Sequence, residues 1–374
     1  MAVFSVVVGI NACGSSEDEA APASGGASTG GVGVDASIGG AAGVGGTGAI
    51  GGTSGSAGTA ASAGKGGVAG SGAEGGVAGS GGLGGSAGAG ATDAGADSGS
   101  GGTPGTHKTS LKVCWTDPTC PRVFAVAHGG LWSLTGAPYD SDAAIAAAYA
   151  ADVDAVKIDV RVTKDNVPVI AHSSPIEIFE SVNCYNKKIE EMNAVDVTKC
   201  IRVPSLTEKF QRLDDVLKYL KGKMIVQLTV KESTDYARTI AEVHAQGAEE
   251  YAFLEISTNE LQNLIPTLPG ADSIYYLINV KTNLTEVDTL IKTIKNPRAF
   301  MYEFEPTVDV SSLTPNTLHP AGVRSFTYTN APAPTQGQLQ ALFEGGFDAV
   351  SSQNAGNCVA ARKIVNAKRG VSPP

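Results

Sequence analysis

The chain has 374 residues, 48 of them glycine, and a formal net charge of −10. Residues 14–106 contain 35 of these glycines, seven acidic residues, one basic residue and no aromatic residue. Such a stretch cannot bury enough apolar surface to offset the entropy of ordering it, so we interpret it as a disordered linker. The remaining part, residues 107–374, is only mildly acidic and has no basic run, which argues against nucleic-acid binding.

The N-terminal segment predicts export. Residues 2–12 are apolar but too few to span a membrane, and their length is typical of a signal-peptide core. The four residues INAC, which end at Cys13, resemble a bacterial lipobox, where the cysteine receives lipid. We therefore expect a lipoprotein signal peptide at 1–13, a lipid anchor at Cys13, and a position in the cell envelope outside the cytoplasm, in the periplasm or at the cell surface.

Cysteine usage fits that expectation, because disulfides form in oxidising compartments. The folded part has five cysteines and neither a C-x-x-C motif nor the spacing of a zinc site. Cys114–Cys120 and Cys184–Cys200 are the short-loop pairings, which would leave Cys358 free. Spacing alone does not determine the connectivity.

The folded part alternates β-rich runs with helical patterns. The predicted strands are Val123–Ala127, Ala155–Val162, Met224–Val230, Tyr251–Ile256, Ser273–Val280, Ala299–Phe304, Val323–Tyr328 and Ala349–Ser352. The predicted helices are Asp142–Ala151, Arg212–Leu220, Asp235–Gln246, Thr258–Ile265, Leu284–Ile294, Gln336–Glu344 and Val359–Ala367. An extra run, Val167–Ala171, follows a turn and indicates a hairpin with the second strand.

Eight strands alternating with helices favour an α/β fold of the (β/α)8 TIM-barrel type, with a doubly wound sheet as the alternative. In a barrel, the chemistry lies at the C-terminal ends of the strands. Polar residues gather at those ends. They are His128, Lys157, Asp159, His172, Gln227, Thr229, Lys231, Asn330 and Gln353. Histidines suit proton transfer near neutral pH and lysines suit an anion such as phosphate.

The segment VFAVAHGG, followed by AYAADVDAVKIDVRVTKDNVPVIAHSS, resembles the signature of the glycerophosphodiester phosphodiesterase family. That pattern runs H-R-G, P-E-N-T, then G-A-D-x-I-E-x-D-V-x-x-T-K-D-G-x-P-V-V-x-H-D. QRLDDVLKYLKGKMIVQLTVK, GVRSFTYTN and GFDAVSSQNA are similar to later parts of the family, so the resemblance spans most of residues 123–365. It implies a (β/α)8 barrel that cleaves phosphodiesters.

The resemblance also implies roles. His128 and His172 match the two histidines that the family uses as acid and base. Asp159 matches a metal-ligand aspartate, and Lys231 matches a lysine at the end of the third barrel strand. We further expect Lys157, Lys231 and Asn330 to bind the substrate, which would be a small phosphodiester or a lipid headgroup.

Several positions depart from the family pattern. Gly129 replaces an arginine, Lys157 replaces a metal-ligand glutamate, Thr229 replaces the third-strand glutamate and Ser173 replaces an aspartate. The P-E-N-T glutamate falls near Tyr139, with Asp140 near the asparagine. The family implies a divalent cation, Ca²⁺ or Mg²⁺, but a lysine about 4 Å from such an ion is repelled by roughly 8 kcal/mol at an effective dielectric of 20. Lys157 could itself supply the positive charge, so metal-free action is the alternative.

These observations lead to a main hypothesis and two rivals. The main one is an exported, lipid-tethered and monomeric phosphodiesterase in which His128 and His172 transfer protons. The second is a catalytically inactive scaffold that acts as a binding lipoprotein, because two of three metal carboxylates are lost. The third is an enzyme similar to sphingomyelinase D, although that family keeps the Glu-x-Asp pair lost here. Glu303 and Glu305 are weaker candidates to replace the lost ligands.

Overall fold

The computed structural model describes residues 106–282, 284–293, 296, 298–329 and 334–372. The predicted signal peptide with Cys13, the predicted linker as far as residue 105, and Asn330 lie outside these described residues. None of the helices in the described ranges has the length and apolar character needed to cross a membrane.

In the described part of the chain, eight parallel strands close into a barrel. Their order is β1, β2, β4, β5, β6, β7, β8 and β9, and β1 pairs with both β2 and β9. The barrel strands are β1 (Phe124–His128), β2 (Ala155–Val162), β4 (Ile225–Val230), β5 (Ala252–Ser257), β6 (Tyr275–Lys281), β7 (Ala299–Phe304), β8 (Arg324–Thr329) and β9 (Ala349–Ser352). The predicted (β/α)8 barrel is therefore confirmed, and the open doubly wound sheet is excluded by this closure.

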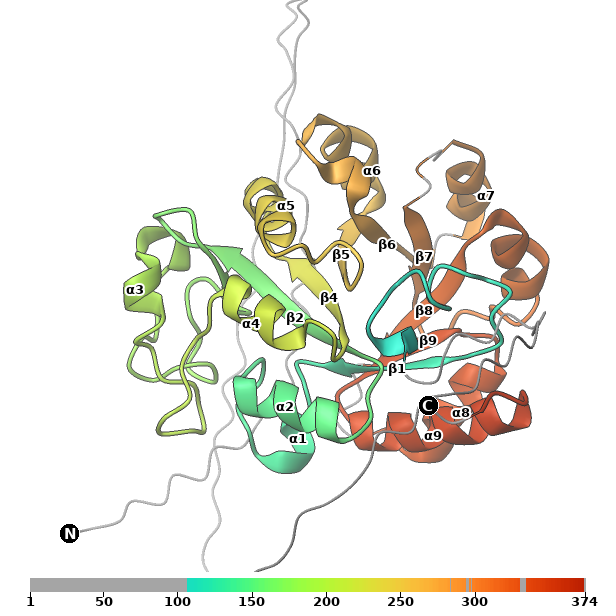
Figure 1. Ribbon diagram of the computed structural model, residues 1–374, viewed down its shortest axis with the longest axis horizontal. Coiled ribbons are helices and arrows are strands. Elements are labelled where there is room, and N and C mark those ends of the chain that lie inside the picture. Colours follow the sequence, from blue (N-terminus) through green and yellow to red (C-terminus); the bar gives the residue numbers. More distant parts are fainter. Residues whose placement is uncertain (1–105, 283, 294–295, 297, 330–333, 373–374) are drawn as a thin grey trace, which may run out of the picture. The chain divides into compact units, whose positions relative to one another are not determined.

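Helices surround the strands and cover their outer faces (Figure 1). They are α1 (Trp132–Thr135), α2 (Asp142–Ala150), α3 (Ala194–Val197), α4 (Leu213–Leu220), α5 (Tyr236–Ala245), α6 (Thr258–Asn263), α7 (Leu284–Thr293), α8 (Gln336–Glu344) and α9 (Ala355–Lys368). This cover explains why most strand residues are apolar on both faces.

Side-chain caps determine where several helices begin. Ser257 and Glu260 form a capping box at the start of α6, and Thr335 and Gln338 form another at α8. The last helix, α9, begins four residues before the predicted Val359, because the Asn354 side chain accepts a hydrogen bond from the Asn357 backbone N–H. The sequence pattern missed this first turn, which contains a glycine.

Strand β3 (Pro168–Ile170) pairs antiparallel with β2 and confirms the predicted hairpin. After it the chain leaves the barrel, and we call residues 173–211, which precede α4, the excursion. It contains α3 and lies beside β2 at the left of Figure 1. A small apolar cluster separate from the barrel core holds it together, and its members include Ile176, Cys184, Ile189, Val197, Cys200 and Phe210.

The disulfides are Cys114–Cys120 and Cys184–Cys200, and Cys358 is buried and unpaired. The short-loop pairing is therefore confirmed. Burial raises the pKa of the Cys358 thiol far above its usual value, which makes it an unreactive part of the core.

The loop closed by Cys114–Cys120 is attached to the barrel by the fully buried Arg324 at the start of β8. Its guanidinium donates to backbone carbonyls of Cys114, Asp117, Cys120 and Arg122 at 2.5–2.9 Å. The Asp348 carboxylate, 3.4 Å away, balances the charge. This network lies at the N-terminal ends of the strands, away from the end where barrel chemistry is expected.

Candidate active site

His128 ends β1 and lies beside an unusual arrangement of Gly129 and Tyr139. Gly129 has φ +71°, and a Cβ atom on it would overlap the ring of Tyr139. The Tyr139 ring therefore occupies the space that a side chain at position 129 would need. Gly129 in place of the family's arginine and the tyrosine near the P-E-N-T glutamate position are thus sterically linked.

Strand β2 supplies Lys157 and Asp159, which point to the same face because they are two residues apart. Lys157 is 7% exposed and Asp159 is fully buried. The Lys157 Nζ atom lies 2.5 Å from Asp159 Oδ1, and Lys231 Nζ, just after β4, lies 2.9 Å from the same oxygen. Both predicted lysines therefore converge on one carboxylate.

His172 follows β3 and is held by the excursion and by the barrel. Its backbone N–H donates to Glu180, its carbonyl accepts from Arg161, and its ring packs edge-on against Phe179. The His172 Nδ1 atom lies 3.0 Å from the hydroxyl of Ser173. The replacement of the family's aspartate by serine therefore leaves a polar partner for the ring.

Tyr139 contacts both histidines at one mouth of the barrel. Its ring makes T-shaped contacts with His128, at a centroid distance of 5.8 Å, and with His172, at 6.0 Å. Its hydroxyl donates to Asp159 at 2.8 Å. Two imidazoles, two ammonium groups and one carboxylate are thus connected through a tyrosine that sequence reasoning did not select.

The neighbouring strands form a second, acidic wall of the site. Glu255 on β5 accepts hydrogen bonds from Gln227 (2.9 Å) and Thr229 (2.6 Å) on β4. Glu303 on β7 is 4% exposed, and its Oε2 atom has no hydrogen-bond partner within the described part of the chain. Glu255 therefore contacts Thr229, which stands at the position of the family's third-strand glutamate. Glu303 is a second buried acid that takes no part in these hydrogen bonds.

Burial and neighbouring charges set the protonation of the histidines. Burial, with a further contribution from the Lys157 charge, lowers the pKa of His128 well below its usual value. Burial is also the main reason that the pKa of His172 falls to about 4. Both imidazoles are therefore neutral at pH 7 in the absence of a bound anion, and a neutral imidazole can accept a proton.

The pKa values of the buried carboxyl groups shift in opposite directions. Burial alone would raise the pKa of Asp159, but the charges of Lys157 and Lys231 outweigh it and hold this pKa well below the usual range. Burial raises the pKa of Asp140 and of Glu303 well above their usual values, and the charges of Asp159 and Glu255, respectively, add to that effect. Asp159 is thus ionised at pH 7, whereas burial favours the neutral form of Glu303.

The residues at the family's metal position do not fit a divalent cation. The Lys157 ammonium occupies the side of Asp159 where the lost glutamate would contribute, and Lys231 contacts the same oxygen. Among the described residues, no group of three histidine, cysteine, aspartate or glutamate side chains is arranged to hold a metal ion. Asp159 is an ion-pair partner here, and its predicted role as a metal ligand stays a prediction.

The structure brings together five predicted residues: His128, Lys157, Asp159, His172 and Lys231. Asn330 lies outside the described residues. Sequence reasoning missed Tyr139, Glu180, Arg202 and Glu255. The sequence could have indicated two of them. Tyr139 falls at a family motif, and Glu255 lies at an inward position two residues before the end of β5. Glu180 and Arg202 had no such signal, because their roles depend on how the excursion folds.

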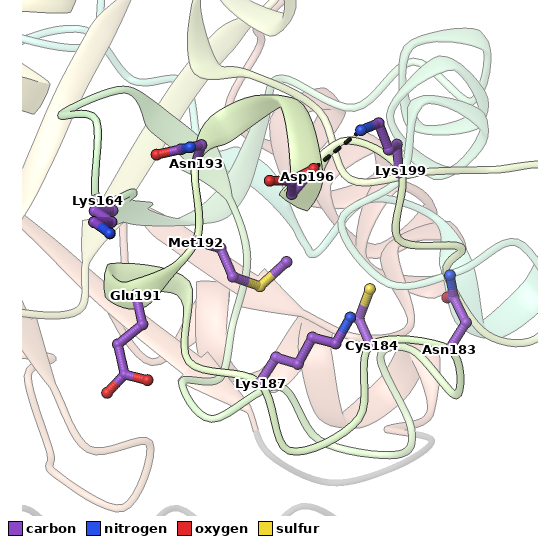
Figure 2. A pocket seen from close by; sticks show the side chains of 9 residues that line it. All are labelled: Lys164, Asn183, Cys184, Lys187, Glu191, Met192, Asn193, Asp196 and Lys199. Carbon is purple, nitrogen blue, oxygen red and sulfur yellow. Dashed lines mark hydrogen bonds and ion pairs between the residues drawn. The ribbon is translucent and has the colours of Figure 1, made fainter.

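A separate surface hollow of about 390 Å³ lies between the excursion and the turn that joins β2 to β3, and is drawn in Figure 2. Its lining includes Lys164, Lys187 and Lys199 together with Glu191 and Asp196. The Asp196–Lys199 ion pair, 3.0 Å long, stands at its edge (Figure 2). None of its lining residues is among the predicted site residues, and its mixed charge singles out no ligand.

Comparison with known proteins supports the motif resemblance. Residues 136–252 match the glycerophosphoryl diester phosphodiesterase family. No curated protein matches the chain.

Solved structures share the barrel. A glycerophosphodiester phosphodiesterase from Agrobacterium tumefaciens is 18% identical, with a TM-score of 0.54 over 64% of this chain and 99% of that one. One from Parabacteroides distasonis is 17% identical, with a TM-score of 0.55 over 70% of this chain and 90% of that one. A phosphodiesterase from Oleispira antarctica, solved with the product sn-glycerol-3-phosphate, is 18% identical, with a TM-score of 0.50 over 64% of this chain and 98% of that one.

Structural matches at such low identity show the fold alone. The match of residues 136–252 adds a similarity in sequence to the family. Over residues 136–252 the chain is therefore similar to the glycerophosphodiester phosphodiesterase family, and it shares the barrel fold of the solved structures, while its residues at the metal position differ from the family pattern.

Proposed function

We propose that this protein is a phosphodiesterase that uses two histidines and two lysines without a metal ion. The observation that carries the proposal is the joint contact of His128 and His172 with Tyr139, whose hydroxyl is bonded to the same Asp159 that holds Lys157 and Lys231. Proton-transfer groups and fixed positive charge at one barrel mouth are what cleavage of a phosphodiester anion requires.

The histidines transfer the protons. A neutral imidazole takes a proton from the attacking hydroxyl, which belongs to water or to the substrate itself. The new P–O bond forms as the bond to the leaving alcohol breaks, and the other imidazole, protonated, gives that alcohol its proton. A bound phosphate anion favours the protonated form of an adjacent histidine, which counteracts the effect of burial on its pKa.

The lysines stabilise the charge that grows on the phosphoryl oxygens. Lys157 stands where the family pattern places a metal-ligand glutamate, and Asp159 fixes its ammonium group. Burial would lower the pKa of Lys157, but the charges of Asp159, Asp140 and Glu255 and the hydrogen bond to Asp159 together outweigh burial and raise it, so the ammonium stays charged. A fixed cation beside the phosphate then supplies the stabilisation that a metal supplies elsewhere.

The sequence and the cysteines support our proposal for the substrate class and the location. We infer that the substrate is a small phosphodiester or a lipid headgroup, that the barrel is monomeric, and that a lipid on Cys13 keeps it near a membrane in the cell envelope. The two disulfides are compatible with an oxidising compartment outside the cytoplasm. Replacing Cys13 by serine should release the protein from the membrane fraction, and retention of that variant would contradict the anchor.

An assay on the purified chain tests the activity. Bis(p-nitrophenyl) phosphate and glycerophosphocholine are incubated with Ca²⁺, with Mg²⁺ or with EDTA. We expect turnover in all three conditions and its loss in His172→Ala. Turnover that EDTA abolishes would disprove the metal-free mechanism. A wild-type chain that binds a phosphodiester without turnover would instead establish the rival function, a catalytically inactive scaffold that binds its ligand.

A further inference from the structure

The excursion carries two buried charged side chains that reach back to the mouth of the barrel. Glu180, which is 3% exposed, accepts hydrogen bonds from the backbone N–H groups of His172 at 2.8 Å and Ser173 at 2.9 Å. Arg202, which is 1% exposed, donates to the backbone carbonyl of Tyr139 at 3.0 Å. The excursion thus has two limbs. The limb that carries Glu180 holds the backbone of His172, and the limb that carries Arg202 holds the backbone of Tyr139.

Arg202 is itself fixed in place. Its guanidinium also donates to the carbonyl of Ile170 in β3 at 2.7 Å, and it lies over the ring of Phe210 at 4.2 Å from the centroid. It therefore links the barrel hairpin, the excursion and the loop that carries Tyr139. An arginine fork suits this task, because its donors are held in one plane and reach two carbonyls at once.

Two ties join the limbs between these charged residues. The Cys184–Cys200 disulfide follows Glu180 on one limb and precedes Arg202 on the other. The Val203 backbone N–H donates to the Glu180 carbonyl at 2.9 Å. Because both ties connect the segments that carry Glu180 and Arg202, a shift of one limb moves the other.

Packing alone does not require charges at these two positions. Replacing buried charges by apolar residues of similar volume often leaves a fold equally stable. Here each charge is instead directed at the backbone of a residue that belongs to the site, and neither one reaches the reacting groups. Glu180 and Arg202 are therefore placed to orient site residues without contacting the substrate themselves.

We propose that the excursion is a positioning element, in which Glu180 orients His172, Arg202 orients Tyr139, and the Cys184–Cys200 disulfide keeps the two aligned. The proposal rests on the proposed phosphodiesterase function. A displacement of about 1 Å in a reacting group can lower the rate roughly 100-fold, so a loosened excursion should affect kcat while substrate binding persists.

Point variants test the positioning residues. Glu180→Gln keeps one acceptor oxygen but sets an amide NH2 against a backbone N–H, so it breaks one of the two bonds. Arg202→Lys keeps the charge and loses the fork. We expect each to lower kcat about 10- to 100-fold, with KM changed less than about threefold. Glu177→Gln, at an exposed position of the same segment, is the matched control and should retain wild-type kcat.

Paired cysteine variants test the tie. Replacing Cys184 and Cys200 by serine should lower kcat, whereas replacing Cys114 and Cys120 by serine removes a disulfide at the other end of the barrel and should not. Equal kcat values in the two double variants, with both proteins folded by circular dichroism, would overturn the alignment role of Cys184–Cys200.

A measurement that needs no turnover separates this proposal from the proposed function. NMR titration of the His172 imidazole in Glu180→Gln should give a pKa above the wild-type value of about 4, because a loosened ring becomes hydrated and burial is the main cause of the depression. An unchanged titration would overturn the role of Glu180 even if the enzyme is active. An inactive wild type would overturn the proposed function alone.

Discussion

Lys157 and Asp159 form a buried ion pair, 2.5 Å long, on one strand of the barrel, at the place where the family pattern has two metal-ligand carboxylates. One substitution has exchanged a ligand for a cation, and the remaining carboxylate pairs with that cation. Because Lys231 contacts the same carboxylate oxygen, two ammonium groups are held at this mouth of the barrel by one carboxylate.

The first prediction concerns this exchange. Lys157→Met should lower kcat/KM for a phosphodiester roughly 100- to 1000-fold, since one preorganised charge is lost. Asp159 retains Lys231 and Tyr139 as partners, so the barrel should stay folded. Turnover measured under EDTA checks the effect, and unchanged turnover in this variant would disprove the role of Lys157.

The reverse change should create metal binding. Lys157→Glu restores a carboxylate beside Asp159, and Glu255 already approaches Thr229 at the place of the third lost ligand. We expect Ca²⁺ binding by titration calorimetry in Lys157→Glu and none in the wild type. Binding of equal strength by both proteins would show that Lys157 does not block a metal.

The coupling of Gly129 and Tyr139 gives a third prediction. Tyr139→Phe removes the hydroxyl bonded to Asp159 but keeps the ring between the histidines, so kcat should fall about tenfold, the cost of one lost hydrogen bond of about 1.4 kcal/mol. Gly129→Ala should lower kcat further than Tyr139→Phe does, because the added Cβ overlaps the tyrosine ring and φ at this position is +71°. The order of the two effects, measured by kcat, checks the coupling; a milder effect in Gly129→Ala would contradict it.

The depressed pKa of His172 predicts how activity and stability depend on pH. Burial lowers this pKa to about 4, against about 6.5 in an unfolded chain. Between these two values the unfolded chain holds a proton on His172 that the folded chain does not. The free energy of unfolding should therefore fall as the pH falls from 6.5 to 4.

Urea unfolding at pH 7 and pH 4.5 measures this effect, and the decrease should be smaller in His172→Ala. The acid limb of kcat/KM should likewise lie near pH 4, where a neutral base is lost. An acid limb near pH 6.5 would contradict a buried histidine as the base. His244→Ala is a suitable control for the acid limb of kcat/KM, since that residue pairs with Glu249 on the outside of the barrel.

Stability should depend strongly on Arg324. Arg324→Met leaves four backbone carbonyls and the Asp348 carboxylate without their common donor in a buried place. We expect a loss of roughly 3–5 kcal/mol in the free energy of unfolding, the range for breaking a buried ion pair. Urea denaturation checks it, and a loss below about 1 kcal/mol would show that water replaces the donor.

The strand pattern was readable from the sequence for a physical reason. Strands such as Ala155–Val162 are buried on both faces by the helices, and buried strands leave continuous apolar runs. The same alternation placed Lys157 and Asp159 on one face, and the family motif placed His128 and His172. These features depend on residues close together along the chain, so the sequence alone determined them.

Tertiary structure decided which side chains meet. Tyr139 connects the two histidines only because Gly129 leaves room for its ring, and Glu255 contacts Thr229 only because β5 pairs with β4 in that register. Glu180 and Arg202 reach the site from an irregular segment without strand or helix periodicity. Contacts of this kind depend on packing between segments that are distant along the chain. The local sequence pattern does not determine that packing.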